Sequence, residues 1–277
     1  MMAVHAHPDD EAFYTGGVFA RYGVEGIRTI LVTCTRGEEG RIGAPELDTD
    51  ENLRRLGQLR EVELECSIRA LGIGTFYQLG YRDSGKRGSR ANMNPVSFHK
   101  AEIEQATQKL VSAIRREHPG VLISYDEKGV YGHLDHIKAH QITVAAFHAA
   151  GDVRAFPEAG EPWQPSKLYF ISTRRNLRFN VPQKMYNAPL FDRRFDSLPN
   201  YARQRAQTVV SIAPVLQRKL QALRCHRTQI HCFHRVFTLP AYALQEFVGQ
   251  ECFILADSLV GYPPAQEIEG DLFAGLR

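Results

Sequence analysis

Two short runs of imidazoles and carboxylates, far apart in the chain, have the residue types that bind a catalytic metal ion. The first run is AHPDDE at residues 6–11, and the second is YGHLDH at residues 131–136. Two histidines and one carboxylate, with a fourth position left to water, make a hydrolytic zinc site. His7 and Asp10 are three residues apart and can face one ion, and His136 would complete the set from the second run. The spacing therefore predicts zinc held by these three side chains.

The remaining polar side chains of the two runs are suited to proton transfer and charge stabilisation around that ion. Asp9 would point toward the metal-bound water, where a carboxylate is a suitable general base. His133 would sit across from Asp9 and would polarise the scissile carbonyl or protonate the leaving amine. Asp135 could hold a neighbouring imidazole in one tautomer, and Tyr131 could donate its hydroxyl to a developing oxyanion. These roles together predict hydrolysis of an amide.

The elements that must position these runs follow from the apolar pattern. Short apolar runs predict strands at residues 1–4, 27–33, 75–79, 121–125, 167–172 and 252–256. Helical periodicity predicts helices at residues 15–22, 51–71, 99–117, 135–150 and 212–223. This alternation predicts a three-layer α/β fold with a mainly parallel sheet and right-handed crossovers.

Each run taken alone also has an ordinary structural interpretation. Residues 7–10 could form a turn with an aspartate N-cap, and residues 133–136 could be a solvated helix start. The topology favours the metal site, because both runs follow strands of the same parallel sheet. Ligands bind at the carboxyl ends of such strands, so the two runs should meet at one edge.

Composition and charge restrict the classes of partner. The chain has 277 residues, of which 43% are hydrophobic and 23% charged, as in ordinary globular proteins. Its formal charge of +3 is too small to indicate nucleic acid or a membrane as a partner. The arginines within residues 174–205 fit a solvated face or contacts to an anionic substrate better. Without a leader pattern or an apolar stretch near the ~18 residues of a membrane span, we expect a cytoplasmic protein.

The five cysteines are spaced irregularly, and an odd number in a chain of this length argues against a disulfide framework. We expect most of them to be buried small apolar residues. A second, structural zinc is the weaker alternative, since no CxxC spacing is present. It would use a group that falls within ten residues, namely Cys225, His226, His231, Cys232 and His234.

Further segments resemble the LmbE/PIG-L superfamily of zinc-dependent N-acetylglucosaminyl deacetylases and related amidases, including mycothiol-pathway enzymes. They are TCTRGEEG at residues 33–40, the pair Arg60-Glu61, GYRDSG at residues 80–85 and ALRCHRTQ at residues 222–229. The resemblance spans residues 3–229 and implies a Rossmann-like sandwich without nucleotide. We expect one domain over residues 1–277, with a core at residues 1–172 and a pocket-completing C-terminal region at residues 173–277.

The resemblance implies the same metal ligands, base and electrophilic or acid partner as the residue types do. It also places five further side chains near a sugar pocket, namely Glu38, Glu39, Arg60, Arg82 and Asp83. An equal alternative is that Arg82 and Asp83 form an internal pair that fixes their own loop.

The implied function is removal of acetyl from an N-acetylglucosamine-type sugar, a small-molecule substrate. Two alternatives stay open: an amidase that cleaves a larger thiol-sugar conjugate, and a non-catalytic sugar-binding module. Lys86 stands where many thiol-pathway members carry methionine, so no single pathway is indicated. The ligand set also tolerates other divalent ions such as Fe2+, and a homo-oligomer is compatible with the sequence.

Overall fold

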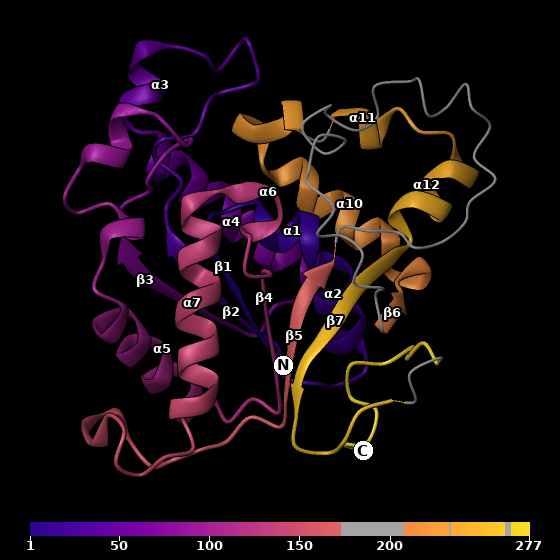
Figure 1. Ribbon diagram of the computed structural model, residues 1–277. Helices are drawn as coiled ribbons and strands as arrows, with labels where there is room; N and C mark the ends of the chain where they lie inside the picture. Colours follow the sequence, from indigo (N-terminus) through magenta and orange to yellow (C-terminus); the bar gives the residue numbers. More distant parts are fainter. Residues whose placement is uncertain (173–207, 233, 264–266) are drawn as a thin grey trace.

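The computed structural model describes residues 1–172, 208–232, 234–263 and 267–277, and its strands form one seven-stranded sheet in the order β3-β2-β1-β4-β5-β7-β6 (Figure 1). The strands are β1 (Met2–His5), β2 (Ile30–Thr35), β3 (Thr75–Tyr81), β4 (Val121–Ser124), β5 (Lys167–Ser172), β6 (Thr208–Ser211) and β7 (Gln250–Ser258). Strands β1 to β5 are parallel, and β7 is antiparallel to β5 and β6. The predicted fold class is confirmed.

Helices cover both faces of the sheet and give the three layers (Figure 1). In one layer α10 packs against α2 and α4, and in the other α5 packs against α7. The main helices are α1 (Asp10–Tyr14), α2 (Gly16–Val24), α3 (Asp50–Arg54), α4 (Leu56–Leu71), α5 (Ile103–Glu117), α6 (Gly129–Gly132), α7 (Leu134–Ala149), α10 (Leu216–Cys225), α11 (His234–Phe237) and α12 (Ala241–Val248). Within the described part of the chain, no helix combines the length and apolar character that crossing a bilayer requires.

The sheet positions the site through a reversal of strand order at its centre. Strands β1, β2 and β4 are buried along their whole length, because a parallel sheet covered on both faces has no polar side. From β1 the order runs to β2 and β3 on one side and to β4 and β5 on the other. A crevice forms outside the carboxyl ends of the strands at such a point. The two strands that flank it precede the two predicted metal-binding runs.

Most predicted elements are present, with differences in bounds. The helix predicted at residues 51–71 is interrupted at Arg55, where the backbone is not helical (φ −112°, ψ 18°), so α3 and α4 are separate. The helix predicted at residues 212–223 begins as a 3-10 turn that contains Pro214, which has no N–H to donate, and becomes α-helical at Leu216. Strand β6 and helix α12 are additional.

The C-terminal strand β7 is tied to the N-terminal helix α2 by a buried carboxylate. Glu251 accepts hydrogen bonds from the backbone N–H of Gly17 at 2.7 Å and of Val18 at 2.8 Å, and so caps α2. Lys219 of α10 pairs with the same carboxylate at 2.5 Å. Residues 173–207, which include the predicted arginine-rich stretch, lie outside the described residues.

A disulfide joins Cys66 of α4 to Cys225 at the end of α10, across 159 residues of sequence. The expectation that the cysteines are mainly buried apolar residues was wrong for this pair. An odd number of cysteines does not exclude a single disulfide, because one bond uses only two of the five. Cys225 is therefore committed to the disulfide, and the second-zinc alternative loses one of its members.

Replacing both Cys66 and Cys225 with serine should lower the free energy of unfolding by about 2–4 kcal/mol, because the bond closes a long loop in the unfolded chain. Urea denaturation followed by circular dichroism measures this difference. A thiol reductant should destabilise the natural protein and leave the double variant unchanged. Equal unfolding midpoints for the two proteins would show that the bond contributes nothing.

Candidate active site

The two predicted metal-binding runs meet at the carboxyl ends of β1 and β4. His7 and Asp10 follow β1, and His136 lies in the first turn of α7. The Oδ2 atom of Asp10 is 3.4 Å from His7 Nδ1 and 3.4 Å from His136 Nε2. All three side chains are buried. The structure thus brings together the side chains predicted as ligands.

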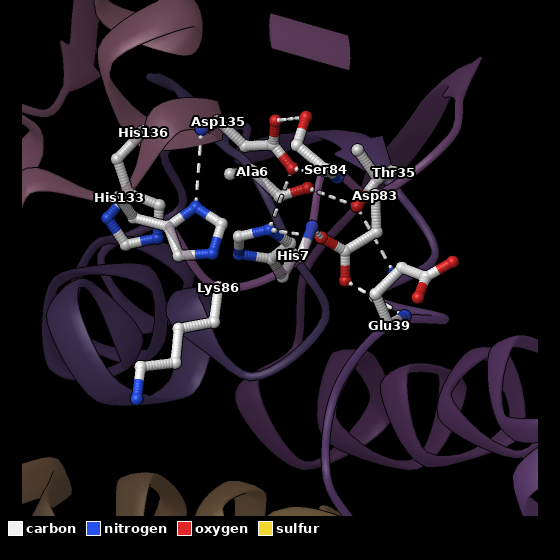
Figure 2. A network of polar contacts seen from close by, with 12 residues as sticks. Ala6, His7, Thr35, Glu39, Asp83, Ser84, Lys86, His133, Asp135 and His136 are labelled. Atoms are coloured by element: carbon white, nitrogen blue, oxygen red, sulfur yellow. Dashed lines mark hydrogen bonds and ion pairs between the residues drawn. The ribbon is translucent and has the colours of Figure 1, made fainter. Parts of the chain in front are cut away.

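The donor set fits a divalent cation. Both ring nitrogens of His136 are buried without a hydrogen-bond partner among the described residues, an arrangement that is costly unless something else satisfies them. His7, His133 and His136 lie side by side in Figure 2, and one ring nitrogen of each lies within 4.8 Å of the others. Imidazole nitrogen together with carboxylate oxygen is the set that zinc prefers.

His7 is also enclosed by two further carboxylates (Figure 2). Its Nε2 lies 3.3 Å from Asp135 Oδ2 and 3.5 Å from Asp83 Oδ1. Ser84 fixes Asp135 through its backbone N–H at 2.8 Å and through its hydroxyl. Asp135 can therefore hold the proton of His7 on Nε2 and leave Nδ1 facing Asp10. Burial lowers the pKa of His7, but the surrounding carboxylates outweigh burial and raise it well above its usual value. The same negative charge favours a bound cation.

Tyr125 is a site residue that the sequence did not single out. Its ring stacks on His136 with a centroid separation of 4.0 Å and an interplanar angle of 11°. Its hydroxyl donates to Asp10 Oδ2 at 2.7 Å and accepts from the N–H of Ala6 at 2.8 Å. Because Tyr125 directly follows the buried residues of β4, the apolar pattern merges it with the strand. A hydroxyl-bearing ring at the carboxyl end of a buried strand was the available clue.

Asp9, the predicted base, is held by a buried arginine and not by the histidines. Arg60 Nη2 lies 3.1 Å from Asp9 Oδ2 and donates to the carbonyl of Pro8, while Nη1 donates to the carbonyl of Gly37 at 2.8 Å. A Cβ at Gly37 would come within 2.2 Å of that nitrogen, so glycine makes room for the guanidinium. Burial raises the pKa of Asp9 to about 7, although Arg60 lowers it. A carboxyl group that ionises near neutrality suits a general base.

His133 and Tyr131 border the same group of imidazoles. His133 is the N-cap of α7, and its Nδ1 accepts from the N–H of Asp135 at 3.2 Å. Burial, together with the neighbouring imidazoles, lowers the pKa of His133 to about 2. A neutral ring that accepts at Nδ1 carries its proton on Nε2 and can donate from there. Tyr131 is 44% exposed, and its ring centroid lies 5.1 Å from that of His136, at the solvent side.

The side chains predicted near a sugar pocket occupy different environments. Arg82 pairs with Glu39 at 2.5 Å, and the two are partly exposed. Asp83 is buried, accepts a hydrogen bond from the N–H of Glu39 at 3.2 Å and faces His7, a predicted metal ligand, at 3.5 Å. Arg82 and Asp83 thus have separate partners and do not pair with each other. Glu38 has a buried Oε2 without a hydrogen-bond partner in the described ranges. Arg60 holds Asp9.

Comparison with known proteins gives one family. The family model described as "PIG-L: GlcNAc-PI de-N-acetylase" matches residues 2–147. A 1D-myo-inositol 2-acetamido-2-deoxy-alpha-D-glucopyranoside deacetylase of Thermobispora bispora is 38% identical, over 100% of this chain and 98% of the relative.

Two solved structures share the fold. The N,N'-diacetylchitobiose deacetylase of Pyrococcus horikoshii superposes with a TM-score of 0.64 at 19% identity and covers 96% of this chain and 86% of that one. The 4-carboxy-2-hydroxymuconate hydratase GalB of Pseudomonas putida gives 0.66 at 18% identity, over 95% and 98%. Because one of these is a hydratase, the fold alone does not fix the reaction. The match in sequence does: the chain belongs to the PIG-L family, described as GlcNAc-PI de-N-acetylases, and is an N-deacetylase.

Proposed function

We propose that this enzyme hydrolyses the acetamide of an N-acetylglucosamine glycoside of myo-inositol, at a zinc ion held by His7, Asp10 and His136. The observation that carries the proposal is the position of Asp10, whose Oδ2 lies 3.4 Å from a ring nitrogen of His7 and 3.4 Å from one of His136. The predicted base, Asp9, is next to Asp10 in sequence. The choice of glycoside is supported by two relatives that match over nearly their whole length and are named as deacetylases of 1D-myo-inositol 2-acetamido-2-deoxy-alpha-D-glucopyranoside. Fe2+ is the alternative ion, since the same ligand types accept it.

The metal and the protein side chains divide the chemistry. Zinc held by His7, Asp10 and His136 would supply Lewis acidity, which would acidify a water molecule and polarise the carbonyl of the amide. Asp9 takes a proton from the attacking water, as its pKa near neutrality allows. The Nε2–H of neutral His133, with the hydroxyl of Tyr131, stabilises the developing negative oxygen. Asp9 then returns the proton to the leaving nitrogen, and acetate and the free amino sugar are released.

Acetate release tests the proposal. We would compare the N-acetylglucosamine inositol glycoside, free N-acetylglucosamine and a bulky thiol-sugar amide, with the protein as purified, chelated and zinc-restored. We expect release from the glycoside that is lost on chelation and returns with zinc. Preferred cleavage of the bulky amide would support a conjugate amidase. The absence of turnover with stoichiometric metal bound would support a sugar-binding role and overturn the proposal.

Arg60→Met should move the acidic limb of the kcat/KM profile to higher pH by roughly one pH unit or more, because a neighbouring guanidinium lowers the pKa of a carboxyl group. Asp9 acts as base only when ionised, so a higher pKa removes activity from the acidic side. The pH dependence of acetate release measures the limb. Arg60→Lys keeps the charge and should shift it less. If the acidic limb stays in place in Arg60→Met, that limb does not report the ionisation of Asp9.

A further inference from the structure

Glu11 is a buried carboxylate at the end of the first predicted metal-binding run. Its side chain is bound by other groups than His7, His133 and His136. Its Oε2 accepts a hydrogen bond from the backbone N–H of Asp9 at 2.9 Å. Its Oε1 accepts from the hydroxyl of Ser67 at 2.5 Å and pairs with His226 Nε2 at 2.7 Å. Glu11, Ser67 and His226 are all fully buried. Because both oxygens of this buried carboxylate have hydrogen-bond partners, Glu11 holds the groups that it binds in fixed positions.

The peptide that Glu11 binds is also fixed from its other side. The Pro8–Asp9 peptide donates its N–H to Glu11, while its carbonyl oxygen accepts from Arg60. Asp9 has φ +111° and ψ −30°, a backbone conformation that L residues rarely adopt. Such a conformation persists only where the surroundings impose it. Two charged side chains, one on each side of a single peptide, impose it here.

The partners of Glu11 are themselves joined covalently. Ser67 follows Cys66, and His226 follows Cys225, so the disulfide links the two segments that supply the hydrogen bonds to Oε1. Helices α4 and α10 therefore present both donors together. The support for Glu11 is built from the fold and does not include any of the proposed metal ligands.

We propose that Glu11 is a positioning residue: it sets the Pro8–Asp9 peptide and thereby the direction of the Asp9 carboxylate. The inference rests on the proposed role of Asp9 as the base. Misplacement of a reacting group by about 1 Å can cost on the order of 100-fold in rate, so the effect of losing Glu11 falls on turnover.

Glu11→Gln tests the inference. The amide keeps the shape of the side chain but cannot accept all three hydrogen bonds with equal strength. We expect kcat for acetate release to fall roughly 10- to 100-fold, with KM within about 3-fold of its original value and full metal content. Ser67→Ala is the second variant, to be used if Glu11→Gln does not fold. It removes only one of the hydrogen bonds to Glu11, so we expect a smaller decrease in kcat.

Glu251→Gln is the matched control. Glu251 is also a buried carboxylate: it pairs with Lys219 and accepts hydrogen bonds from backbone N–H groups of α2. None of these partners belongs to the proposed active site. Its loss should lower the thermal midpoint while kcat of the folded protein stays unchanged. Equal kcat losses for Glu11→Gln and Glu251→Gln would reduce Glu11 to a structural residue and overturn the inference.

A double variant separates this inference from the proposed base. If Asp9→Asn alone keeps normal turnover, the assignment of the base fails, whatever Glu11 does. If Asp9→Asn abolishes most turnover, Glu11→Gln added to it should change the residual rate by less than about 2-fold, because a residue that acts only through Asp9 has nothing left to position. Losses that multiply would show that Glu11 acts independently of Asp9.

Discussion

Changing Asp9 to asparagine should lower kcat by about 100- to 10,000-fold, the usual contribution of a general base, while the protein keeps its metal. Asparagine has nearly the shape of aspartate and can still accept a hydrogen bond from Arg60, but it cannot take a proton from water. The residue lies against Arg60, 3.1 Å away, and not among the three proposed ligands, so the metal should stay. Acetate release and elemental analysis of the same preparation measure both quantities.

Asp83→Asn is the informative comparison for that experiment. Asp83 is another buried carboxylate of the site, and it faces His7 at 3.5 Å. It should affect metal affinity more than proton transfer. If the two variants lose turnover equally and both retain metal, Asp9 is not distinguished as the base, and the other buried carboxylates become candidates.

Changing His136 to alanine should weaken metal binding by more than about 100-fold. Side chains that only hydrogen-bond to a metal ligand typically change metal affinity by about 10- to 100-fold, and the loss of a ligand itself should cost more. His136 is fully buried, and neither of its nitrogens has a protein hydrogen-bond partner in the part of the chain that the structure describes. Its loss should therefore remove a ligand and with it the activity. Metal titration of the chelated protein, followed by activity, measures the change.

His140→Ala controls for the loss of any imidazole from α7. His140 lies one turn further along the helix, and its Nδ1 contacts the carbonyl of Tyr125 at 2.9 Å. The alanine variant should bind metal as the natural protein does. Retained metal at full stoichiometry in His136→Ala would instead point to the alternative group of His7, Asp83 and Asp135, whose ligand atoms also lie within 4.8 Å of one another.

The meeting of the two runs could be predicted because it depends on local patterns. A strand followed by His7 and Asp10, and a second parallel strand followed by His136, put both runs at one sheet edge. The prediction that these side chains bind a metal ion rests on their chemistry. Alternation of strands and helices likewise specified the parallel part of the sheet, since each crossover needs a helix of its own.

The features that could not be predicted depend on contacts between distant segments. The disulfide joins residues 159 positions apart, and spacing gives no information about such a pair. Tyr125 is a site residue because its hydroxyl reaches Asp10, which the apolar pattern of its strand conceals. The short β6 carries too few residues for a periodic pattern, and β7 gives it a place in the sheet. The roles of Arg60 and Asp83 likewise depend on which neighbours the fold brings to them.

The link from Glu251 to α2 has a consequence for the order in which the molecule can be completed. The N-terminal segment is synthesised first, yet α2 gains its cap only from β7, and Glu11 gains its partner His226 from the end of α10. Contacts across more than 200 residues form slowly, because the loop between them must close first. The turn that carries Asp9 therefore gains its final support, through Glu11, only after α10 and His226 have been synthesised.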